Sequence, residues 1–352
     1  MANNIRIKTL PREPSQFLLK NIVMYGANKS GKTTLLLDIM SQIRPYIPNV
    51  VAFAPTADSN NSLKGVVPDI LINRRVELSK IKEVYTRQKD SAIAYNNAND
   101  PEVLQSLFKR VAGNSQIAIE QKIIQIQVLM DRKLEQGAMS TIERSKQSKK
   151  ISEMSNAFRV SLYKTTIRST ANVLVKMNLT SVERQAIKFL DFNPHLLMIF
   201  DDCASIFTKK FQNDPMIKDL FYMYRHSFIT IIFTFQDDLG LESFLRKNAS
   251  LSFFTTQQCA NAYFERSSNS FSRDIKSDAS EKASIIFDKN QNAIPEFSKL
   301  LYVRDDLFPI RYYTAELHET FRFGSKSLWK FCEKIDQIRR ANQSISSTFG
   351  CY

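Results

Sequence analysis

A stretch near the start of the chain has the residue types and spacing of a phosphate-binding loop. Gly26 to Thr33 read G-A-N-K-S-G-K-T, which matches the pattern G-x-x-x-x-G-K-T. The glycines let backbone N–H groups surround a triphosphate, and the dipole of a following helix favours its negative charge. Lys32 has the length to reach the β- and γ-phosphates, and the Thr33 hydroxyl is a ligand for Mg²⁺. We therefore expect the nucleotide to be bound by one contiguous set of residues: Gly26, Ala27, Asn28, Lys29, Ser30, Gly31, Lys32, Thr33 and Thr34.

A pair of carboxylates follows an apolar run much later in the chain. The run is Leu196–Phe200, and the next two residues are Asp201 and Asp202. Carboxylates that follow a buried strand are typical of the Walker B motif, in which the first one holds Mg²⁺ through water. We expect this role for Asp201, and we expect Asp202 to act as general base toward the attacking water. Taken alone, the segment also fits a strand that ends in a polar turn.

Gln236 and Arg225 are further candidates for the catalytic set. Gln236 follows the apolar run Thr230–Phe235. If this run forms a strand between the two Walker strands, the Gln236 amide lies where it can bind both the γ-phosphate and the attacking water; otherwise it only caps a loop. Arg225 precedes the same run and is a candidate arginine finger, which acts on the nucleotide of a neighbouring subunit and therefore requires a ring. A surface arginine is the alternative for Arg225.

Runs of apolar, β-branched and aromatic residues indicate the elements that must position these side chains. Near-continuous apolarity within such runs is typical of central strands in a parallel sheet that helices cover on both faces. Helical stretches separate most of the runs, so the pattern predicts a doubly wound α/β fold. The expected strands are Asn21–Tyr25, Asn49–Ala54, His195–Phe200, Phe228–Phe235 and Leu251–Thr256. A hairpin of Leu300–Val303 and Ile310–Thr314 and a helix from about Lys326 to Ala341 are expected to follow.

A long segment without strand signals separates the second and third expected strands. It spans about 140 residues, which is too many for a simple βαβ crossover. Part of it reads as a helix with an apolar stripe rich in isoleucine, formed by Ile117, Ile119, Ile123, Ile124, Ile126, Val128 and Leu129. We predict a helical insertion over residues 76–190. It divides the core into residues 1–75, with the Walker A motif, and residues 191–352, with the Walker B motif, the sensor glutamine, the hairpin and the closing helix.

The chain is strongly basic. It has 49 Lys and Arg against 35 Asp and Glu, a net charge of +14 over 352 residues. Between residues 132 and 188, 12 basic residues stand against 4 Glu. We interpret this part of the insertion as a surface that contacts the phosphate backbone of double-stranded DNA independently of sequence; a solvated helix face is the alternative. The candidate contacts are Arg144, Lys146, Lys149, Lys150, Arg159, Lys164 and Arg168.

Cysteine and histidine usage argues against a zinc site. The four cysteines and three histidines are scattered, without C-x-x-C pairs or zinc-ligand spacing. The N-terminus lacks a signal-peptide core, and no apolar run reaches the roughly 18 residues that span a bilayer. We expect free thiols and a soluble, intracellular protein.

Together these motifs resemble the genome-packaging ATPases of nucleocytoplasmic large DNA viruses, within the FtsK–HerA superfamily. The resemblance covers roughly residues 15–80 and 190–332 and leaves out the insertion. Many relatives in the broader superfamily have Glu after the Walker B Asp, whereas this chain has Asp202, whose shorter side chain holds its carboxylate further back. The resemblance rests on Gly26–Thr33, Ala54–Thr56, Val67–Asp69, Ile199–Asp202, Arg225–His226, Phe235–Gln236 and Phe321–Trp329.

The resemblance implies a RecA-like, Mg²⁺-dependent ATPase that assembles as a ring and threads double-stranded DNA into a preformed capsid, in the virion or the cytoplasm of an infected host. It gives the Walker residues, Gln236 and Arg225 the roles stated above, and it is the basis for expecting ATP rather than GTP. A helicase or DNA-remodelling ATPase of replication and a nucleotide-switched protein that binds DNA or capsid with little turnover remain open. A nucleotide kinase fits less well, because the chain is long and the carboxylate pair followed by a strand ending in Gln236 does not suit one.

Overall fold

The computed structural model describes residues 7–136, 140–288, 294–295 and 297–349. The chain divides into two compact units. Met1–Lys89 and Pro194–Tyr352 form the core unit, and Asp90–Asn193 form the insertion unit. The core unit therefore includes the first half of helix α3 (Leu78–Ala98), which the sequence pattern alone had placed in the insertion.

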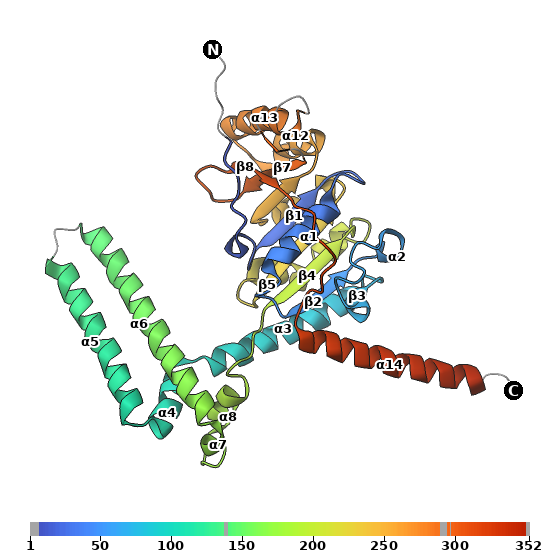
Figure 1. Ribbon diagram of the computed structural model, residues 1–352. Helices are drawn as coiled ribbons and strands as arrows, with labels where there is room; N and C mark the ends of the chain where they lie inside the picture. Colours follow the sequence, from blue (N-terminus) through green and yellow to red (C-terminus); the bar gives the residue numbers. More distant parts are fainter. Residues whose placement is uncertain (1–6, 137–139, 289–293, 296, 350–352) are drawn as a thin grey trace. The chain divides into compact units, whose positions relative to one another are not determined.

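An eight-stranded sheet lies at the centre of the core unit (Figure 1). Its strand order is β3-β2-β4-β5-β1-β6-β7-β8; the strands from β3 to β6 are parallel, and β7 and β8 are antiparallel. This mainly parallel sheet confirms the predicted RecA-like α/β fold. The strands are β1 (Asn21–Tyr25), β2 (Asn49–Phe53), β3 (Ile72–Asn73), β4 (Leu196–Asp201), β5 (Ile229–Phe235), β6 (Leu251–Phe254), β7 (Ser298–Val303) and β8 (Ile310–Thr314).

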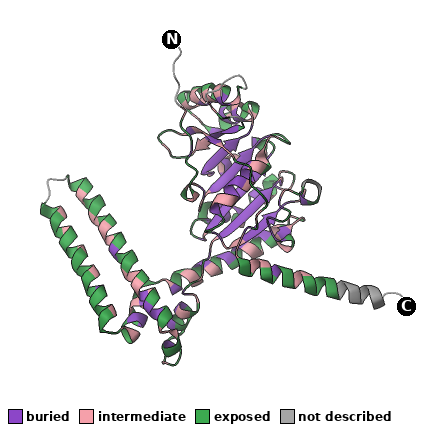
Figure 2. Cartoon of the chain, viewed as in Figure 1, coloured by how far each residue is buried: buried purple, intermediate pink, exposed green. Residues whose placement is uncertain are grey.

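Both faces of the sheet are covered, as the continuous apolar runs required. Successive side chains of a strand point to opposite faces. In β1, Val23 and Tyr25 belong to one apolar cluster, whereas Ile22 and Met24 belong to another that includes Leu35 of α1. Figure 2 shows the central strands as buried throughout. The core helices are α1 (Lys32–Ile43), α2 (Ala57–Asn60), α9 (Lys209–Gln212), α10 (Pro215–Met223), α11 (Ser243–Arg246), α12 (Gln257–Glu265), α13 (Arg273–Phe287) and α14 (Lys326–Phe349).

The insertion unit is helical in its described residues. Leu104, Phe108 and Tyr163 lie in its small apolar core. Capping boxes at Ser140 and Thr180 begin α6 and α8, because each side chain accepts a hydrogen bond from the N–H of a glutamate that bonds back to the cap. The helices are α4 (Pro101–Val111), α5 (Asn114–Gln136), α6 (Thr141–Ser169), α7 (Ala171–Leu174) and α8 (Ser181–Lys188).

Helix α5 forms where the isoleucine-rich segment predicted a helix, but the predicted single apolar stripe is wrong. The side chains that α5 turns toward α6 are partly polar: Tyr163 donates a hydrogen bond to Glu120, and Ser148 donates one to Asp131 at 3.0 Å. With 3.6 residues per turn, the isoleucines lie on both flanks of this contact. Most of the apolar side chains of α5 are therefore exposed (Figure 2), namely Ile117, Ile119, Ile124, Ile126, Val128, Leu129 and Met130.

Among the helices in the described part of the chain, none combines the length and the apolar character needed to cross a bilayer.

Candidate nucleotide-binding site

The carboxyl ends of neighbouring parallel strands meet at one edge of the sheet. Strand β5 lies between β4 and β1, and the register pairs Asp201 with Thr234 and Tyr25 with Phe235. The loop after β1, the carboxylates at the end of β4 and Gln236 after β5 therefore leave the sheet side by side. Open α/β sheets bind their ligands at this edge.

The glycine-rich loop is held tightly by its own residues and by the segment after β6. Gly31 has a φ of 90°, in the left-handed region that glycine adopts without strain. A Cβ at Gly26 would lie 1.6 Å from Thr255 Oγ1, so only glycine fits there. Ser30 Oγ donates to the Ala27 carbonyl at 2.7 Å and lies 2.6 Å from Thr255 Oγ1. The loop leads directly into α1, whose first N–H groups lack intrahelical acceptors and are suited to phosphate.

Lys32 lies across this loop. Its Nζ donates to the carbonyls of Gly26 at 2.6 Å and Ala27 at 2.9 Å. Burial lowers the pKa of Lys32, and the negative charges of Asp202 and Asp201 oppose that shift. The Lys32 ammonium group is thus held against the phosphate loop of its own chain.

The two carboxylates have different surroundings. Asp201 is buried and accepts hydrogen bonds from Thr234 Oγ1 at 2.6 Å and from Ser62 Oγ at 3.0 Å. Asp202 is half-buried with a φ of 53°, and its N–H donates to Thr234 Oγ1 at 3.0 Å. Gln236 Nε2 lies 3.4 Å from Asp202 Oδ1. Asp201 is thereby fixed by hydroxyl groups, whereas Asp202 remains accessible beside the Gln236 amide.

These side chains fit a nucleoside triphosphate with Mg²⁺. The exposed Thr33 hydroxyl and the Asp201 carboxylate are hard oxygen ligands, which Mg²⁺ prefers. Backbone N–H groups at the start of α1 and the Lys32 ammonium are the donors that phosphate oxygens need.

Arg225 lies near the amino-terminal end of β5, opposite the carboxyl ends of the strands where the phosphate loop lies. It follows α10 and precedes β5, whose opposite end leads to Gln236. Its Nε donates to Tyr224 Oη at 2.9 Å, and its Nη2 donates to Ser250 Oγ at 3.4 Å. The structure does not bring Arg225 to the phosphate loop of its own chain, so a finger role could only be exerted on a neighbouring subunit.

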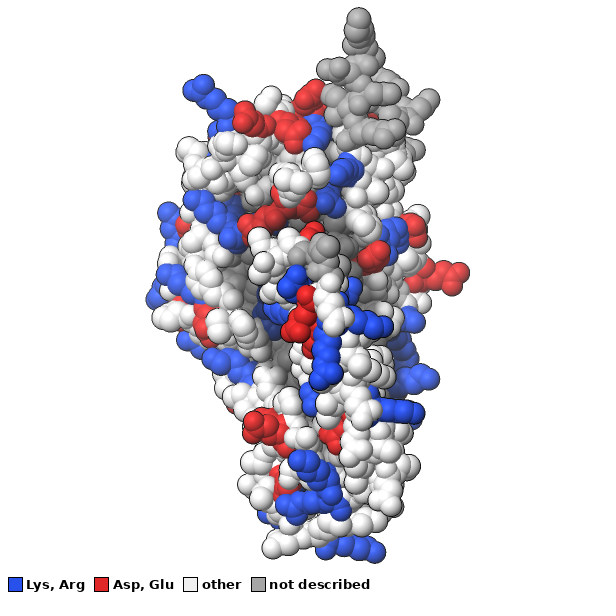
Figure 3. Space-filling model, turned by 90° about the vertical axis from the view of Figure 1, so that its left-hand side faces the viewer, with Lys and Arg blue, Asp and Glu red and all other residues white. Residues whose placement is uncertain are grey.

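The basic residues of the insertion unit differ in exposure. Lys146, Lys149 and Lys150 are exposed on α6. Arg168 forms an ion pair with Asp191, and its hydrogen bond lowers the pKa of that carboxyl group. On the face shown in Figure 3, basic side chains are dispersed among acidic and uncharged ones. The remaining candidates are half-buried: Arg144, Arg159 and Lys164.

The sequence did not single out Ser62, Thr234 or Lys299. Thr234 was recognisable as a polar residue in an otherwise apolar strand, but Ser62 lies in a turn and gave no signal. Lys299 is buried on β7, and its Nζ donates to the Ser30 carbonyl at 3.1 Å. Its only signal was a lysine at the start of an apolar run.

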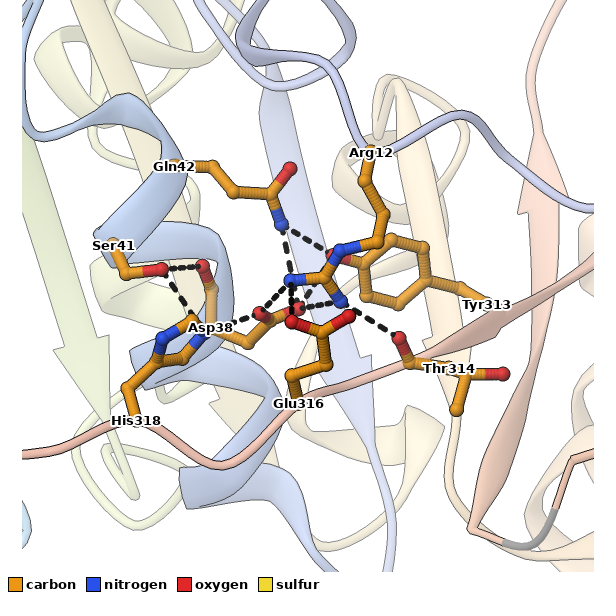
Figure 4. A network of polar contacts seen from close by, with 8 residues as sticks. All are labelled: Arg12, Asp38, Ser41, Gln42, Tyr313, Thr314, Glu316 and His318. Atoms are coloured by element: carbon orange, nitrogen blue, oxygen red, sulfur yellow. Dashed lines mark hydrogen bonds and ion pairs between the residues drawn. The ribbon is translucent and has the colours of Figure 1, made fainter.

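A buried ionic network ties the phosphate-loop helix α1 to β8 and the segment after it (Figure 4). Asp38 has no exposed surface and accepts hydrogen bonds from Arg12 Nη2 at 2.6 Å and from Tyr313 Oη at 2.5 Å. His318 Nε2 also lies 2.6 Å from Asp38, and Glu316 lies 3.1 Å from Arg12. Although the two carboxylates and His318 lie close enough to share a cation, the Arg12 guanidinium already contacts both carboxylates. We therefore interpret the network as a structural clamp on α1.

Comparison with known proteins gives a full-length viral relative. No family model matches the chain. It is 29% identical over 348 residues to the "Uncharacterized protein B354L" of African swine fever virus (isolate Pig/Kenya/KEN-50/1950), an alignment that covers 94% of this chain and 91% of the relative.

Similar solved structures include a viral packaging enzyme. The genome packaging NTPase B204 from Sulfolobus turreted icosahedral virus 2, in complex with AMPPCP, is 13% identical with a TM-score of 0.37, over 85% of this chain and 99% of that one. The plasmid coupling protein TrwB, in complex with the non-hydrolysable GTP analogue GDPNP, is 11% identical with a TM-score of 0.37, over 93% of this chain and 92% of that one. Because these TM-scores are low, the fold rests on the strand order and loop geometry of this chain.

Proposed function

We propose that the chain is a Mg²⁺-dependent ATPase motor that translocates double-stranded DNA and packages a viral genome into a preformed capsid. The observation that carries the proposal is the meeting of Lys32, Asp202 and Gln236 at one edge of the sheet, with β5 between the two Walker strands.

ATP hydrolysis follows from the chemistry of these side chains. Lys32 neutralises charge that develops on the β- and γ-phosphates. Asp202 accepts a proton from the attacking water, while the adjacent Gln236 amide orients that water. Thr33 and Asp201 would hold Mg²⁺, which when bound would further neutralise the phosphate oxygens. A protein that only binds nucleotide has no need for a carboxylate–amide pair at this position.

DNA translocation is supported by the charge of the chain and by the resemblance of its motifs to packaging ATPases. The net charge of +14 favours association with a polyanion. The relative that matches 94% of this chain is a viral protein. In a ring, Arg225 of one subunit would act on the nucleotide of the next, which fits its distance from the phosphate loop of its own chain.

ATP turnover with and without double-stranded DNA tests the proposal. We expect stimulation by the duplex, and we expect Asp202→Asn to lower kcat about 10²- to 10⁴-fold while ATP binding persists. Asparagine tolerates positive φ, so the backbone at this position is kept. Asp305→Asn is the matched control, because Asp305 is also left-handed, with a φ of 61°, and is exposed.

Other outcomes would select the alternatives. Turnover that is indifferent to DNA would remove translocation from the proposal. Separation of the strands of a forked substrate would favour the helicase, and DNA affinity without turnover would favour the nucleotide-switched binding protein.

A further inference from the structure

The strand arrangement brings Lys299 to the phosphate loop from a distant part of the sequence. Strand β7 is antiparallel to β6, with Leu300 opposite Phe254. Lys299 therefore lies beside the segment that follows β6, at the edge where the phosphate loop leaves β1. Alternation along the strand puts Lys299 on the same face as Leu301, which packs in the cluster of α1.

The ammonium group of Lys299 is buried without a compensating carboxylate. Lys299 is 7% exposed, and its Nζ donates to the Ser30 carbonyl at 3.1 Å. The same atom lies 3.1 Å from where a Cβ of Gly31 would be. Among the described residues no ion pair is formed with Lys299, and burial lowers its pKa. Buried charges are ordinarily paired, so this site holds positive charge that an anion would balance.

We propose that Lys299 is a second cationic residue of the nucleotide site, which positions the phosphate loop through the Ser30 carbonyl and adds its charge behind the loop to favour bound β- and γ-phosphates. This inference rests on the proposed binding of ATP. The Ser30 carbonyl and the Gly31 N–H belong to one trans peptide group and point in opposite directions, so Lys299 holds the side of this peptide that lies away from the Gly31 N–H. Lys299 therefore acts on the nucleotide through the loop and by its charge.

Substitutions at Lys299 separate the charge from the hydrogen bond. Lys299→Gln keeps an N–H donor for Ser30 without the charge, Lys299→Arg keeps the charge, and Lys299→Met keeps neither. Nucleotide affinity is measured by titration of each variant with MgATP, ADP and AMP. We expect the Kd for MgATP to rise roughly tenfold or more in the Gln and Met variants, equivalent to about 1.4 kcal/mol, and to change much less in the Arg variant. AMP should be affected least, because it lacks the β- and γ-phosphates.

The pH dependence provides a readout that a purely structural role would not change. Burial lowers the pKa of Lys299, so its charge is lost at a lower pH than that of a free lysine. MgATP affinity of the wild type should therefore weaken on the alkaline side; the pKa of Lys32 is also lowered by burial, but Lys32 is the same in wild type and Lys299→Arg, so the difference between the two proteins reports Lys299. Arginine stays protonated, so Lys299→Arg should retain affinity to a higher pH than the wild type does.

Lys282→Met controls for the loss of a partly buried lysine in the same unit. Lys282 forms an ion pair with Asp278 at 2.8 Å, so it already has a partner. Thermal unfolding of each variant identifies any that fail to fold. We expect Lys282→Met to bind MgATP as the wild type does.

Two results would overturn the inference about Lys299 while leaving the proposed nucleotide binding intact. If wild type binds MgATP and Lys299→Gln binds it equally well, or if all three Lys299 variants lose the same affinity, the charge of Lys299 has no role. If the wild type binds no MgATP, the nucleotide site itself is rejected, and the inference falls with it.

Discussion

Gly26 is the position where one methyl group should disable the phosphate loop. The Cβ of Gly26→Ala would lie 1.6 Å from Thr255 Oγ1 and 2.7 Å from Ser30 Oγ, so the loop must move away from the segment after β6. We expect MgATP affinity to fall at least about tenfold, and overpacking to cost about 1–3 kcal/mol of stability. Nucleotide titration and thermal unfolding measure both.

Gly113→Ala is the matched control for this substitution. The nearest atom to its added Cβ is Gln116 Oε1 at 3.1 Å, at the end of a flexible side chain in the insertion unit. It should leave nucleotide affinity unchanged. Wild-type affinity in Gly26→Ala would show that the loop adopts another conformation when it binds.

The sequence predicted those site residues that belong to short motifs, in which neighbouring residues along the chain act together. The phosphate loop and the carboxylate pair each directly follow a strand, so their types and spacing were sufficient to propose their roles. Ser62 contacts Asp201 across 139 residues, and Lys299 contacts Ser30 across 269. Such partners depend on strand order and side-chain direction, which spacing along the chain does not contain.

At the scale of elements, the clamp on α1 should be a main source of stability for the site. Asp38→Asn leaves the Arg12 guanidinium without its buried partner and weakens the bond from Tyr313. Arg12 is partly exposed, which limits the penalty. We expect a loss of about 2 kcal/mol in the free energy of unfolding, as for hydrogen bonds to charged groups, with weaker nucleotide binding as α1 loosens.

Glu316→Gln tests whether the buried hydrogen bonds of Asp38 contribute more to stability than the exposed ion pair between Glu316 and Arg12. The Glu316 side chain is 62% exposed and forms an ion pair with the partly exposed Arg12. Surface ion pairs contribute about 0–1 kcal/mol, so the effect should be small. Equal losses in urea unfolding of Asp38→Asn and Glu316→Gln would contradict the assignment of the clamp to Asp38.

Helix α8 should show a pH dependence that comes from its N-terminal cap. The Thr180 N–H donates to Glu183 at 2.8 Å and, with Arg110 and Ser106, lowers the pKa of Glu183. Because this folded-state pKa is below the unfolded value of about 4.3, the stabilisation is present above that pH and is lost as pH falls through the lowered pKa.

Glu183→Gln measures this contribution. The substitution should lower stability at pH 7 by about 1 kcal/mol and reduce the loss of α8 protection that follows as the pH falls below the unfolded value of about 4.3. Hydrogen exchange of the α8 amides reports both effects. An unchanged acid response would assign the stabilisation to the Thr180 hydroxyl alone.

The sequence predicted the central strands correctly. It did not predict β3, or which side of α5 packs against α6. Strands β1, β2, β4, β5 and β6 coincide with the predicted runs to within about two residues, a typical uncertainty for element boundaries. Strand β3 has only two residues, Ile72 and Asn73, which is too short to give a pattern. In α5 the isoleucine periodicity identified the helix. Because the contact with α6 uses Glu120 and Asp131, the apolar residues did not predict which side of α5 faces α6.

For the whole molecule, the location of the positive charge decides how DNA would be bound. Lys146, Lys149 and Lys150 are exposed and spaced so that they share one side of α6. Arg168 is already paired with Asp191 and is a weaker candidate. If the insertion binds the phosphate backbone, replacing the three lysines should lower duplex affinity. The slope of log K against log salt concentration should then become shallower by about 0.9 for each phosphate that the variant no longer neutralises.

The matched control removes the same charge from lysines that already have carboxylate partners in the core unit: Lys80, Lys82 and Lys89. Both triple alanine variants change the net charge equally, so duplex titrations at several salt concentrations distinguish a local surface from overall attraction. We expect the α6 variant to bind the duplex more weakly and with less salt dependence, and the control to change little in either. Equal effects in both would mean that the net charge of +14, rather than a surface on the insertion, attracts DNA, and the insertion would then have no part in gripping the duplex.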